Sequence, residues 1–401
     1  MIPYKTPHII SMVGITVGNG SYIPVAHTQI MSATTTEAYN QTYMFKSGTW
    51  SGLSIYIRTA NASGDTTFTV RKNGSDTAIT LTVPQNSTGR FEDLVNTASV
   101  AVGDLISIGV TTSAGTITPT SITVLYETND GTTAQYFMAH SDTGGSFSAN
   151  NRYIRPSTSE IKGSITSEVL TSNIVQHNST IEGVAVYVSL NARTAGSTVS
   201  SRVNSSSGIG VTIATTSTGM FTNTGSQSIT AGDSVNSVFT FSSGANAITI
   251  RTVTMFVVST NPREITLIAG NPVVRNTTNT NNAWAFIGGI VVFSGAGEAV
   301  AREYPVTGGV LSGFQWYASA NTSTQDLVMY VRKNGADGNE NITYTTGSTG
   351  WIQDATNSDT IASTDYVAVR TARAASGSGT TTFQHTSIKY TMDPLLRVIT
   401  I

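Results

Sequence analysis

The sequence predicts an all-β protein built from three tandem antiparallel β-sandwich domains of jelly-roll type. Three observations support this prediction: short runs alternate apolar and polar residues, turn-forming residues separate the runs, and the whole pattern recurs about every 131 residues. Alternation with a period of two is typical of a strand that buries one face. No stretch shows helical periodicity, so we expect two packed sheets in each domain and no helical layer.

The repeat is defined by marker residues that occur once in each third of the chain. Its period is too long for a solenoid, whose units span about 20 to 50 residues, so it indicates duplication of a whole domain. The predicted domains are residues 1–131, 132–262 and 263–393, followed by a tail strand at 394–401. The markers are Tyr22, Tyr153 and Trp284; Glu37, Glu168 and Glu298; Gly52, Gly183 and Gly313; Gly89, Gly219 and Gly350; and Asp104, Asp233 and Asp365.

About eight short strands are expected in the first domain. Eight strands in about 131 residues favour a jelly roll, whereas an immunoglobulin-like sandwich, the alternative, needs only about 100 residues. The alternation in Leu53–Arg58 places its isoleucines in the core, and the same pattern in the third domain places Trp316 there. The expected strands lie near residues 8–16, 22–30, 41–47, 53–60, 66–72, 78–83, 104–111 and 120–128.

Turn residues lie between these runs. Asn73-Gly74 and Asn334-Gly335 predict type I′ turns, because Asn and Gly both accept a positive φ. The second domain has Asn204 followed by serines, a weaker signal. The recurring aspartates are expected to cap the backbone before a late strand. The joints near 127–133 and 259–263 are short, which indicates domains held in nearly fixed orientation.

The composition argues against several classes of function. Charged residues make up 11% of the chain, against about 25% in an average protein, and the net charge is −2. Without a basic run, nucleic acid is not expected as a partner. No stretch of 18 apolar residues predicts membrane insertion, and the N-terminus lacks the pattern of a signal peptide. With no cysteine, disulfides and thiolate metal sites are not expected either.

No catalytic motif is apparent, so we expect a protein that is not an enzyme and has no cofactor and no metal. The five histidines do not recur between domains, and structural or surface roles are expected for them. The recurring glutamates have no evident recurring partner, so a catalytic carboxylate pair is not predicted. The oxygen-rich segment 334–341 does not fit the spacing of an EF-hand, so a polar hairpin is favoured over a calcium site.

A contact surface is predicted from residues that point away from the core. Tyr56, Tyr187 and Tyr317 occupy matching outward positions, and tyrosine is common at interfaces, although packing at the solvent edge is equally consistent. Trp351 is a feature of the third domain alone. The tail contributes Leu395, Val398, Ile399 and Ile401, which predict a last strand. That strand either pairs within its own domain or adds to a sheet of a neighbouring subunit.

The first domain contains the segments V-R-K-N-G (70–74), T-L-T-V-P (80–84), S-T-G-R-F-E-D (87–93) and V-A-V-G-D-L-I-S-I (100–108). This order of strand and turn segments resembles jelly-roll modules in virion proteins of tailed bacteriophages, of the capsid-decoration and fibre types. The third domain keeps V-R-K-N-G and S-T-G-W-I-Q-D, and the second keeps S-T-G-M-F and A-G-D. The resemblance implies a location in the virion after synthesis in the host cytoplasm, with other virion proteins as partners.

The function expected on this basis is structural: capsid decoration or a vertex protein, acting through protein–protein docking as a homo-oligomer, with a trimer favoured. A decorating role is preferred over a fibre because the chain has no repetitive shaft. The alternative is a tail-fibre or lectin-like protein that recognises host surface glycans. Its signature is a set of exposed aromatic residues converging on one groove.

Overall fold

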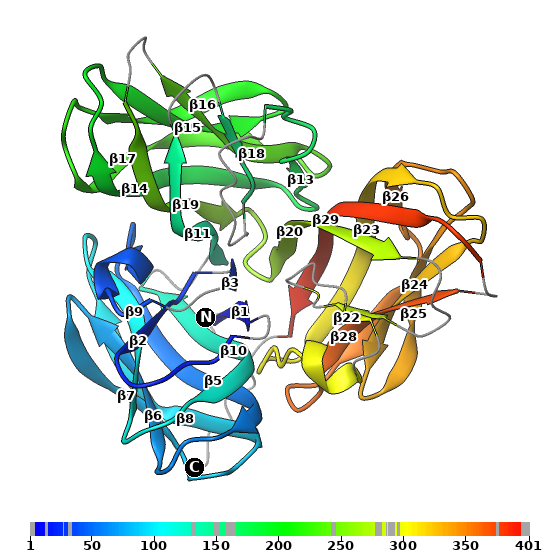
Figure 1. The fold of residues 1–401 in the computed structure, drawn as a ribbon, viewed down its shortest axis with the longest axis horizontal. Helices are drawn as coiled ribbons and strands as arrows, with labels where there is room; N and C mark the ends of the chain where they lie inside the picture. The colour runs from blue at the N-terminus through cyan, green and yellow to red at the C-terminus, as the bar shows by residue number, and fades with distance from the viewer. Residues whose placement is uncertain are drawn as a thin grey trace.

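The computed structural model confirms the all-β prediction (Figure 1). In the described residues the regular structure is β-strand, apart from two 3-10 turns, η1 (Glu37–Asn40) and η2 (Glu298–Ala301). The predicted tail strand at 394–401, with Leu395, Val398, Ile399 and Ile401, lies outside these residues. The structure describes residues 5–12, 15–26, 28–30, 34–129, 134–147, 152–156, 166–241, 246–276, 283–285, 287, 293–294, 297–373 and 377–393.

The described residues form six sheets, and each sheet draws its strands from one stretch of the chain. We call the sheet pair of residues 6–128 lobe 1, that of 135–259 lobe 2 and that of 264–392 lobe 3. The first sheet of lobe 1 has the order β3 (Thr28–Ile30), β1 (Thr6–Met12), β10 (Ile117–Thr128), β5 (Gly48–Ala60) and β8 (Gly89–Val100). Its second sheet has the order β2 (Ser21–Pro24), β9 (Leu105–Thr112), β6 (Thr66–Lys72) and β7 (Ser75–Val83), with β4 (Thr42–Tyr43) also paired to β9.

Lobes 2 and 3 repeat this arrangement. In lobe 2 the first sheet has the order β11 (Gln135–Phe147), β19 (Ile248–Ser259), β14 (Ser179–Asn191) and β17 (Gly219–Ile229). Its second sheet has the order β12 (Arg152–Ile154), β18 (Ser234–Phe241), β15 (Ser197–Val203) and β16 (Ser206–Ile213), with β13 (Asn173–Ile174) also paired to β18. In lobe 3 the first sheet has the order β20 (Glu264–Asn276), β29 (Thr380–Met392), β23 (Gly309–Asn321) and β26 (Gly350–Gln353), with β27 (Ser358–Ile361) also paired to β23. Its second sheet has the order β22 (Phe293–Ser294), β21 (Ala283–Ala285), β28 (Val367–Arg373), β24 (Leu327–Lys333) and β25 (Ala336–Tyr344).

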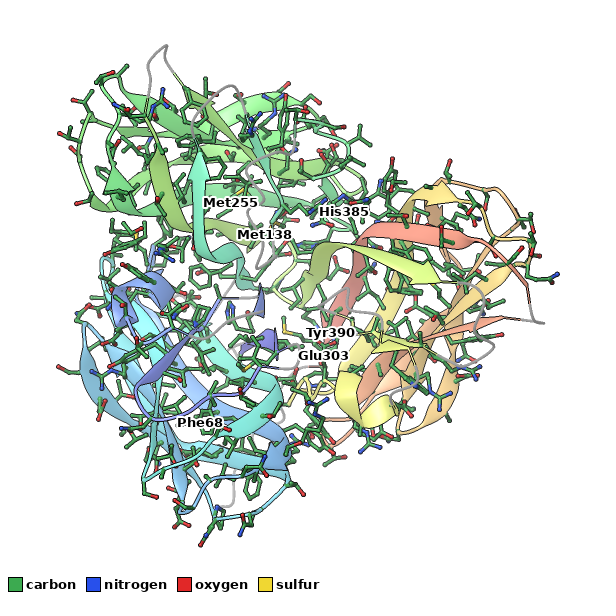
Figure 2. All side chains as sticks on the ribbon, in the orientation of Figure 1. Phe68, Met138, Met255, Glu303, His385 and Tyr390 are labelled. Carbon is green, nitrogen blue, oxygen red and sulfur yellow. The ribbon has the colours of Figure 1, made fainter. Side chains whose placement is uncertain are left out.

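The strand order explains how one pattern builds every lobe. In each first sheet, the first long strand lies beside the last, so β1 pairs with β10, β11 with β19 and β20 with β29. The chain then crosses repeatedly between the two sheets, apart from a hairpin within the second sheet (β6–β7, β15–β16 and β24–β25), and this is the connectivity of a jelly-roll sandwich. Large apolar side chains fill the space between the sheets, as Phe68 does in lobe 1 (Figure 2), and Trp316 is fully buried in lobe 3, as predicted.

The predicted strands of lobe 1 differ from the structure in the regions 22–30, 41–47 and 89–100. The run 41–47 contains only the two-residue β4, whereas the long strand β8 was not predicted at all. β8 lies at the edge of its sheet, half of its residues are exposed and only two are buried, so its sequence lacks the alternation that marks a half-buried strand. The run 22–30 is divided into β2 and β3.

The predicted hairpin turns are confirmed. Asn73 and Gly74 have φ values of 51° and 79°, and Asn334 and Gly335 have 50° and 85°. Lobe 2 makes the same turn with Asn204 at 47° and Ser205 at 66°. Each of these asparagines donates its side-chain N–H to the recurring aspartate of its lobe, over 2.7, 2.6 and 2.6 Å. These aspartates are also backbone caps, because they accept the N–H groups of Ala101, Thr230 and Ala362.

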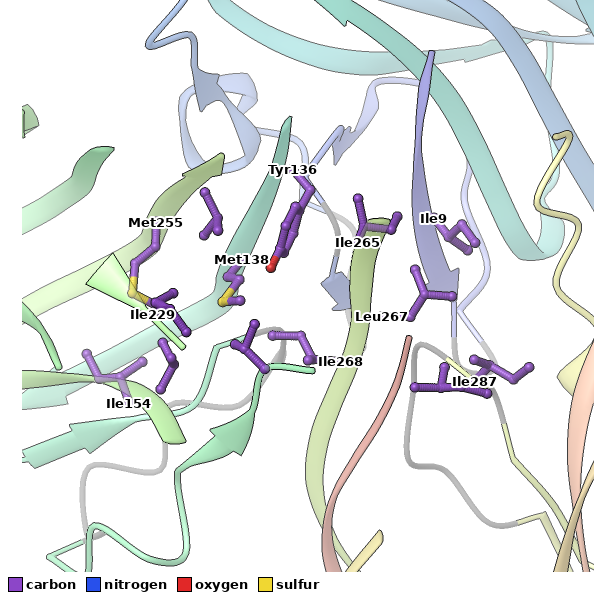
Figure 3. Packing of buried hydrophobic residues seen from close by; sticks show 14 of the residues in the cluster. Ile9, Tyr136, Met138, Ile154, Ile229, Met255, Ile265, Leu267, Ile268 and Ile287 are labelled. Carbon is purple, nitrogen blue, oxygen red and sulfur yellow. The ribbon is translucent and has the colours of Figure 1, made fainter. Parts of the chain in front are cut away.

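The three lobes lie around a common centre, with β1, β11 and β20 near the middle (Figure 1). Their cores are not separate. One apolar cluster contains residues of lobes 2 and 3 together with Ile9 of lobe 1, and Figure 3 shows Tyr136 between Met138 and Ile265. A second cluster joins the lobe 1 core to Phe137 and Phe256 of lobe 2. These shared clusters, together with the short joints, hold the lobes against one another.

Candidate functional site

The recurring glutamates each bind an arginine that lies 34 residues later in the chain. Glu37 accepts from Nε of Arg71 over 2.9 Å, Glu168 from Arg202 over 2.6 Å and Glu298 from Arg332 over 3.1 Å. The recurring partner of each glutamate is therefore an arginine, which the sequence pattern did not reveal, and not the second carboxylate of a catalytic pair. The arginines were overlooked because, within V-R-K-N-G, they lie beside a turn whose signal dominates the sequence pattern.

The recurring aromatic residues complete this cluster. The guanidinium carbons lie 5.7 Å from the Tyr22 ring, 5.6 Å from the Tyr153 ring and 5.1 Å from the Trp284 ring. Burial raises and Arg202 lowers the pKa of Glu168, and the net direction is down, so this carboxylate stays ionised. Because its pKa is lowered, the Glu168 carboxylate is a poor general acid and a weak general base near neutral pH. The cluster instead fastens the loop that carries each glutamate to its second sheet.

Two of the three outward tyrosines, Tyr56 and Tyr187, lie at contacts between lobes. Tyr56 of lobe 1 stacks on Tyr304 of lobe 3, and Arg302 donates to the Tyr56 hydroxyl over 3.4 Å. Tyr187 of lobe 2 lies 5.9 Å from Tyr39 of lobe 1, whose ring also carries Arg251 at 4.2 Å.

Tyr317 lies near the border between lobes 2 and 3. Its ring centroid is 5.5 Å from Trp351 and 5.9 Å from His385, and Figure 2 places His385 beside lobe 2. Arg155 of lobe 2 crosses this border by donating to Gln384 of lobe 3 over 2.9 Å. Tyr56 and Tyr187 are thus used in contacts between lobes of the same chain, whereas the ring contacts of Tyr317 are with residues of its own lobe.

Each tyrosine has a different cross-strand partner. Arg90 pairs with Tyr56, Met220 with Tyr187 and Trp351 with Tyr317. Arg90 reaches lobe 3 by lying 5.0 Å from the Tyr304 ring, and Met220 packs on the lobe 1 core. At the matching position of lobe 3, Trp351 lies against His385 of its own lobe, with ring centroids 6.1 Å apart.

At a second set of matching positions, the border of lobes 1 and 2 has apolar residues where the border of lobes 2 and 3 has polar ones. At the border of lobes 1 and 2, the Phe45 ring stacks on Phe256 at 5.7 Å and lies directly against Gly183. The pseudo-equivalent residues at the border of lobes 2 and 3, 131 or 130 positions later, are Gln176, Ser387 and Gly313. There, Gln176 donates to the Ser387 hydroxyl over 3.2 Å and lies over Gly313.

A cleft of about 500 Å³ opens at this polar border. Lobe 2 contributes Gln176 and the segment around Gly232, and lobe 3 contributes β23, β26 and the segment 355–358. No aromatic residue is among the described residues that line it, so the converging aromatic groove expected of a lectin is not seen here. The polar lining residues are Gln176, Ser312, Gln315, Gln353, Thr356, Asn357, Ser358 and Lys389.

Buried histidines have structural surroundings where the structure describes them. His8 packs among Trp50, Tyr126 and Phe137. His177 shares a hydrogen bond of 2.9 Å with the Thr266 hydroxyl, across the border of lobes 2 and 3. In the part of the chain that the structure describes, no group of three His, Asp or Glu residues is placed to hold a metal ion.

Segment 334–341 forms a polar hairpin, as favoured from the sequence. Asp337 contacts Arg332 and Arg370, and Glu340 turns into the core of lobe 3. These contacts explain the density of oxygen atoms in this segment as hairpin and core chemistry.

Comparison with known proteins identifies no matching family model and no curated protein similar in sequence. Among the described residues, no helix has both the length and the apolar character needed to cross a membrane.

Proposed function

We propose that this chain is a non-enzymatic structural protein of a tailed-phage particle, a capsid decoration or vertex protein that acts by docking on other virion proteins. The resemblance of the strand and turn segments to virion jelly-roll modules supports the class of protein. The docking role is supported by the closed ring that the three lobes form. In this ring of lobes, lobe 1 contacts lobe 2 through Tyr39 and Tyr187, and lobe 3 contacts lobe 1 through Tyr304 and Tyr56.

A closed ring suits adhesion because three similar surfaces keep fixed positions around one centre. Binding then loses little conformational entropy, and many weak contacts can act together. The Arg–Glu clusters serve the same end, since they fix the loops of each lobe.

The homotrimer predicted from the sequence remains a prediction. The ring of lobes offers another way to match a binding site with threefold symmetry, because a single chain already presents three similar lobes. Light scattering on the purified protein separates the two: one copy has a mass of 42.1 kDa, and a trimer has about three times that mass.

The location is tested on particles. Quantitative mass spectrometry of purified virions, combined with antibody labelling in electron microscopy, should find the protein in many copies on the head. Labelling confined to the tail would favour the fibre alternative, and absence from the particles would refute the proposal.

One observation favours the glycan-binding alternative, namely the amide-rich cleft between lobes 2 and 3. Binding of the isolated protein to host surface polysaccharide would support a receptor-binding role.

A further inference from the structure

The cleft between lobes 2 and 3 exists because one contact of the ring lacks the apolar side chains that fill its counterpart. Between lobes 1 and 2, Phe45 and Phe256 stack and cover Gly183. Between lobes 2 and 3, an amide and a hydroxyl, Gln176 and Ser387, take their places. An amide and a hydroxyl occupy far less volume than two phenyl rings, so the space beside them stays open to solvent.

The lining of this cleft is rich in groups that both donate and accept hydrogen bonds. Gln315 is buried and donates to Ser387 over 2.7 Å, which fixes its amide in the floor. Gln353 is exposed at the rim, and its side chain makes no hydrogen bond to any described residue. Asn357 donates to Asp354 over 2.8 Å, which orients its amide at the opposite side. Amides presented in this way suit a ligand that carries many hydroxyl groups.

The charge of the lining excludes a strongly anionic ligand. Lys389 is the cation among the described lining residues, and its Nζ lies 3.9 Å from a carboxylate oxygen of Glu264. Apolar contact is limited mainly to Ile174, Ala231 and Ala355, so a hydrophobic ligand would find little surface. Trp351 lies two residues before Gln353 on the same face of β26, which puts one half-buried aromatic ring next to the rim.

We propose that this cleft binds a neutral saccharide, one to three sugar units of a surface polysaccharide, through the amides of Gln176, Gln315, Gln353 and Asn357. A volume of about 500 Å³ lies within the range of small-molecule sites. The proposal does not depend on the virion role: a protein that fails to decorate a particle can still bind sugar here.

Nuclear magnetic resonance on the full chain tests the site. The probes are glucose, galactose, mannose and N-acetylglucosamine, together with their linear di- and trisaccharides at millimolar concentration. At least one should shift the side-chain amide signals of Gln353 and Asn357, while the signal of Gln85, an exposed glutamine on lobe 1, stays in place. If no probe shifts the cleft signals, or if the shifts lie elsewhere, the proposal is overturned.

Two kinds of variant then test the mechanism. Gln353→Ala and Asn357→Ala each remove one exposed amide and should weaken binding about fivefold, as expected for one hydrogen bond, whereas Gln85→Ala should bind like the unmodified protein. The double variant Gln176→Phe with Ser387→Phe copies the aromatic pair of lobes 1 and 2 and should abolish binding. Unchanged affinity in the two alanine variants would overturn the proposal even if the double variant failed to fold.

Discussion

The ring of Tyr56 lies nearly parallel to the ring of Tyr304, with centroids 5.2 Å apart and planes inclined by 23°, although almost 250 residues separate them. Tyr56 belongs to β5 of the first lobe, and Tyr304 follows η2 in the last. Burial, reinforced by the nearby Tyr56, raises the pKa of Tyr304 to about 12. This stack joins the two ends of the chain of lobes.

Removing either tyrosine side chain should weaken this contact between lobes 1 and 3. Tyr56→Ala and Tyr304→Ala are each expected to lower the free energy of unfolding by about 2 kcal/mol, because an aromatic pair and its buried area are lost. In a double-mutant cycle followed by urea unfolding, the pair should show a coupling energy of about 1 kcal/mol. Strict additivity would mean that the stack contributes nothing to stability.

A methyl group at Gly183 should disturb the contact between lobes 1 and 2. A Cβ placed there would overlap the Phe45 ring, so Gly183→Ala is expected to cost about 1–3 kcal/mol in thermal or urea unfolding. Gly196→Ala is the matched control, since its Cβ would meet only an ordinary contact. Removing the Phe45 ring in the double variant Phe45→Ala with Gly183→Ala should relieve the overlap. The double variant should therefore lose less unfolding free energy than the sum of the losses in the two single variants.

The Arg–Glu clusters should contribute more to stability than an exposed ion pair does. Arg332 and Glu298 have side chains only 10% and 12% exposed, and Glu298→Gln is expected to cost about 1–3 kcal/mol, because it weakens a charge-assisted hydrogen bond. Lys46 and Glu182 are about one-third exposed, so Glu182→Gln should change the unfolding free energy by less than about 1 kcal/mol. Equal effects of the two substitutions in urea unfolding would contradict a stabilising role for the cluster.

Glu340 should make lobe 3 less stable as the pH rises. Its carboxyl group is buried and accepts the N–H of Phe314 over 2.9 Å; burial, with added repulsion from Asp359 and Asp354, raises its pKa to about 8. The folded chain keeps a proton that the unfolded chain releases near pH 4.5. Stability should therefore fall between about pH 5 and 8, by at most about 1.4 kcal/mol per pH unit. Glu340→Gln should flatten this slope in urea titrations, and an unchanged slope would exclude Glu340 as its source.

His177 should act in the opposite pH range. Burial, and to a lesser degree the charge of Lys389, lowers its pKa to about 3. Below about pH 6.5 the imidazole of His177 binds a proton in the unfolded chain but not in the folded chain. The free energy of unfolding should therefore fall as the pH decreases from about 6.5 towards 3. His177→Gln keeps a hydrogen-bonding group for Thr266 and should reduce the acid sensitivity. Midpoints of urea unfolding measured at pH 4 and pH 7 check this, and an equal loss in the variant would assign the effect to other groups.

Much of the fold could be predicted from the sequence because its signals are local. The alternation around Ile55 and Ile57 depends only on the two faces of one strand. The turn at Asn73-Gly74 depends on the φ values that two residues accept. Strand β8 was missed for the same reason, since an exposed edge strand needs no alternation, and its pairing with β5 is decided by a partner about 40 residues away.

The candidate site was less predictable. The recurring Glu37 and Tyr22 were visible as markers, but the link between them is Arg71, which adjoins a turn in the sequence and was not assigned a role. A search for a cation at a constant spacing from each glutamate would have identified it. The cleft at Gln176 could not be found in this way, because its lining comes from two lobes.

By itself, the sequence determined the strand-forming pattern, the tight turns and the near-131-residue period, because these depend on the chemistry of neighbouring residues along one chain. Only the tertiary structure decided that Tyr56 faces another lobe of its own chain, and that Phe45 fills one border while Gln176 leaves its counterpart open. Those outcomes depend on side chains from distant segments meeting in space, and no local pattern encodes which outward face will be covered.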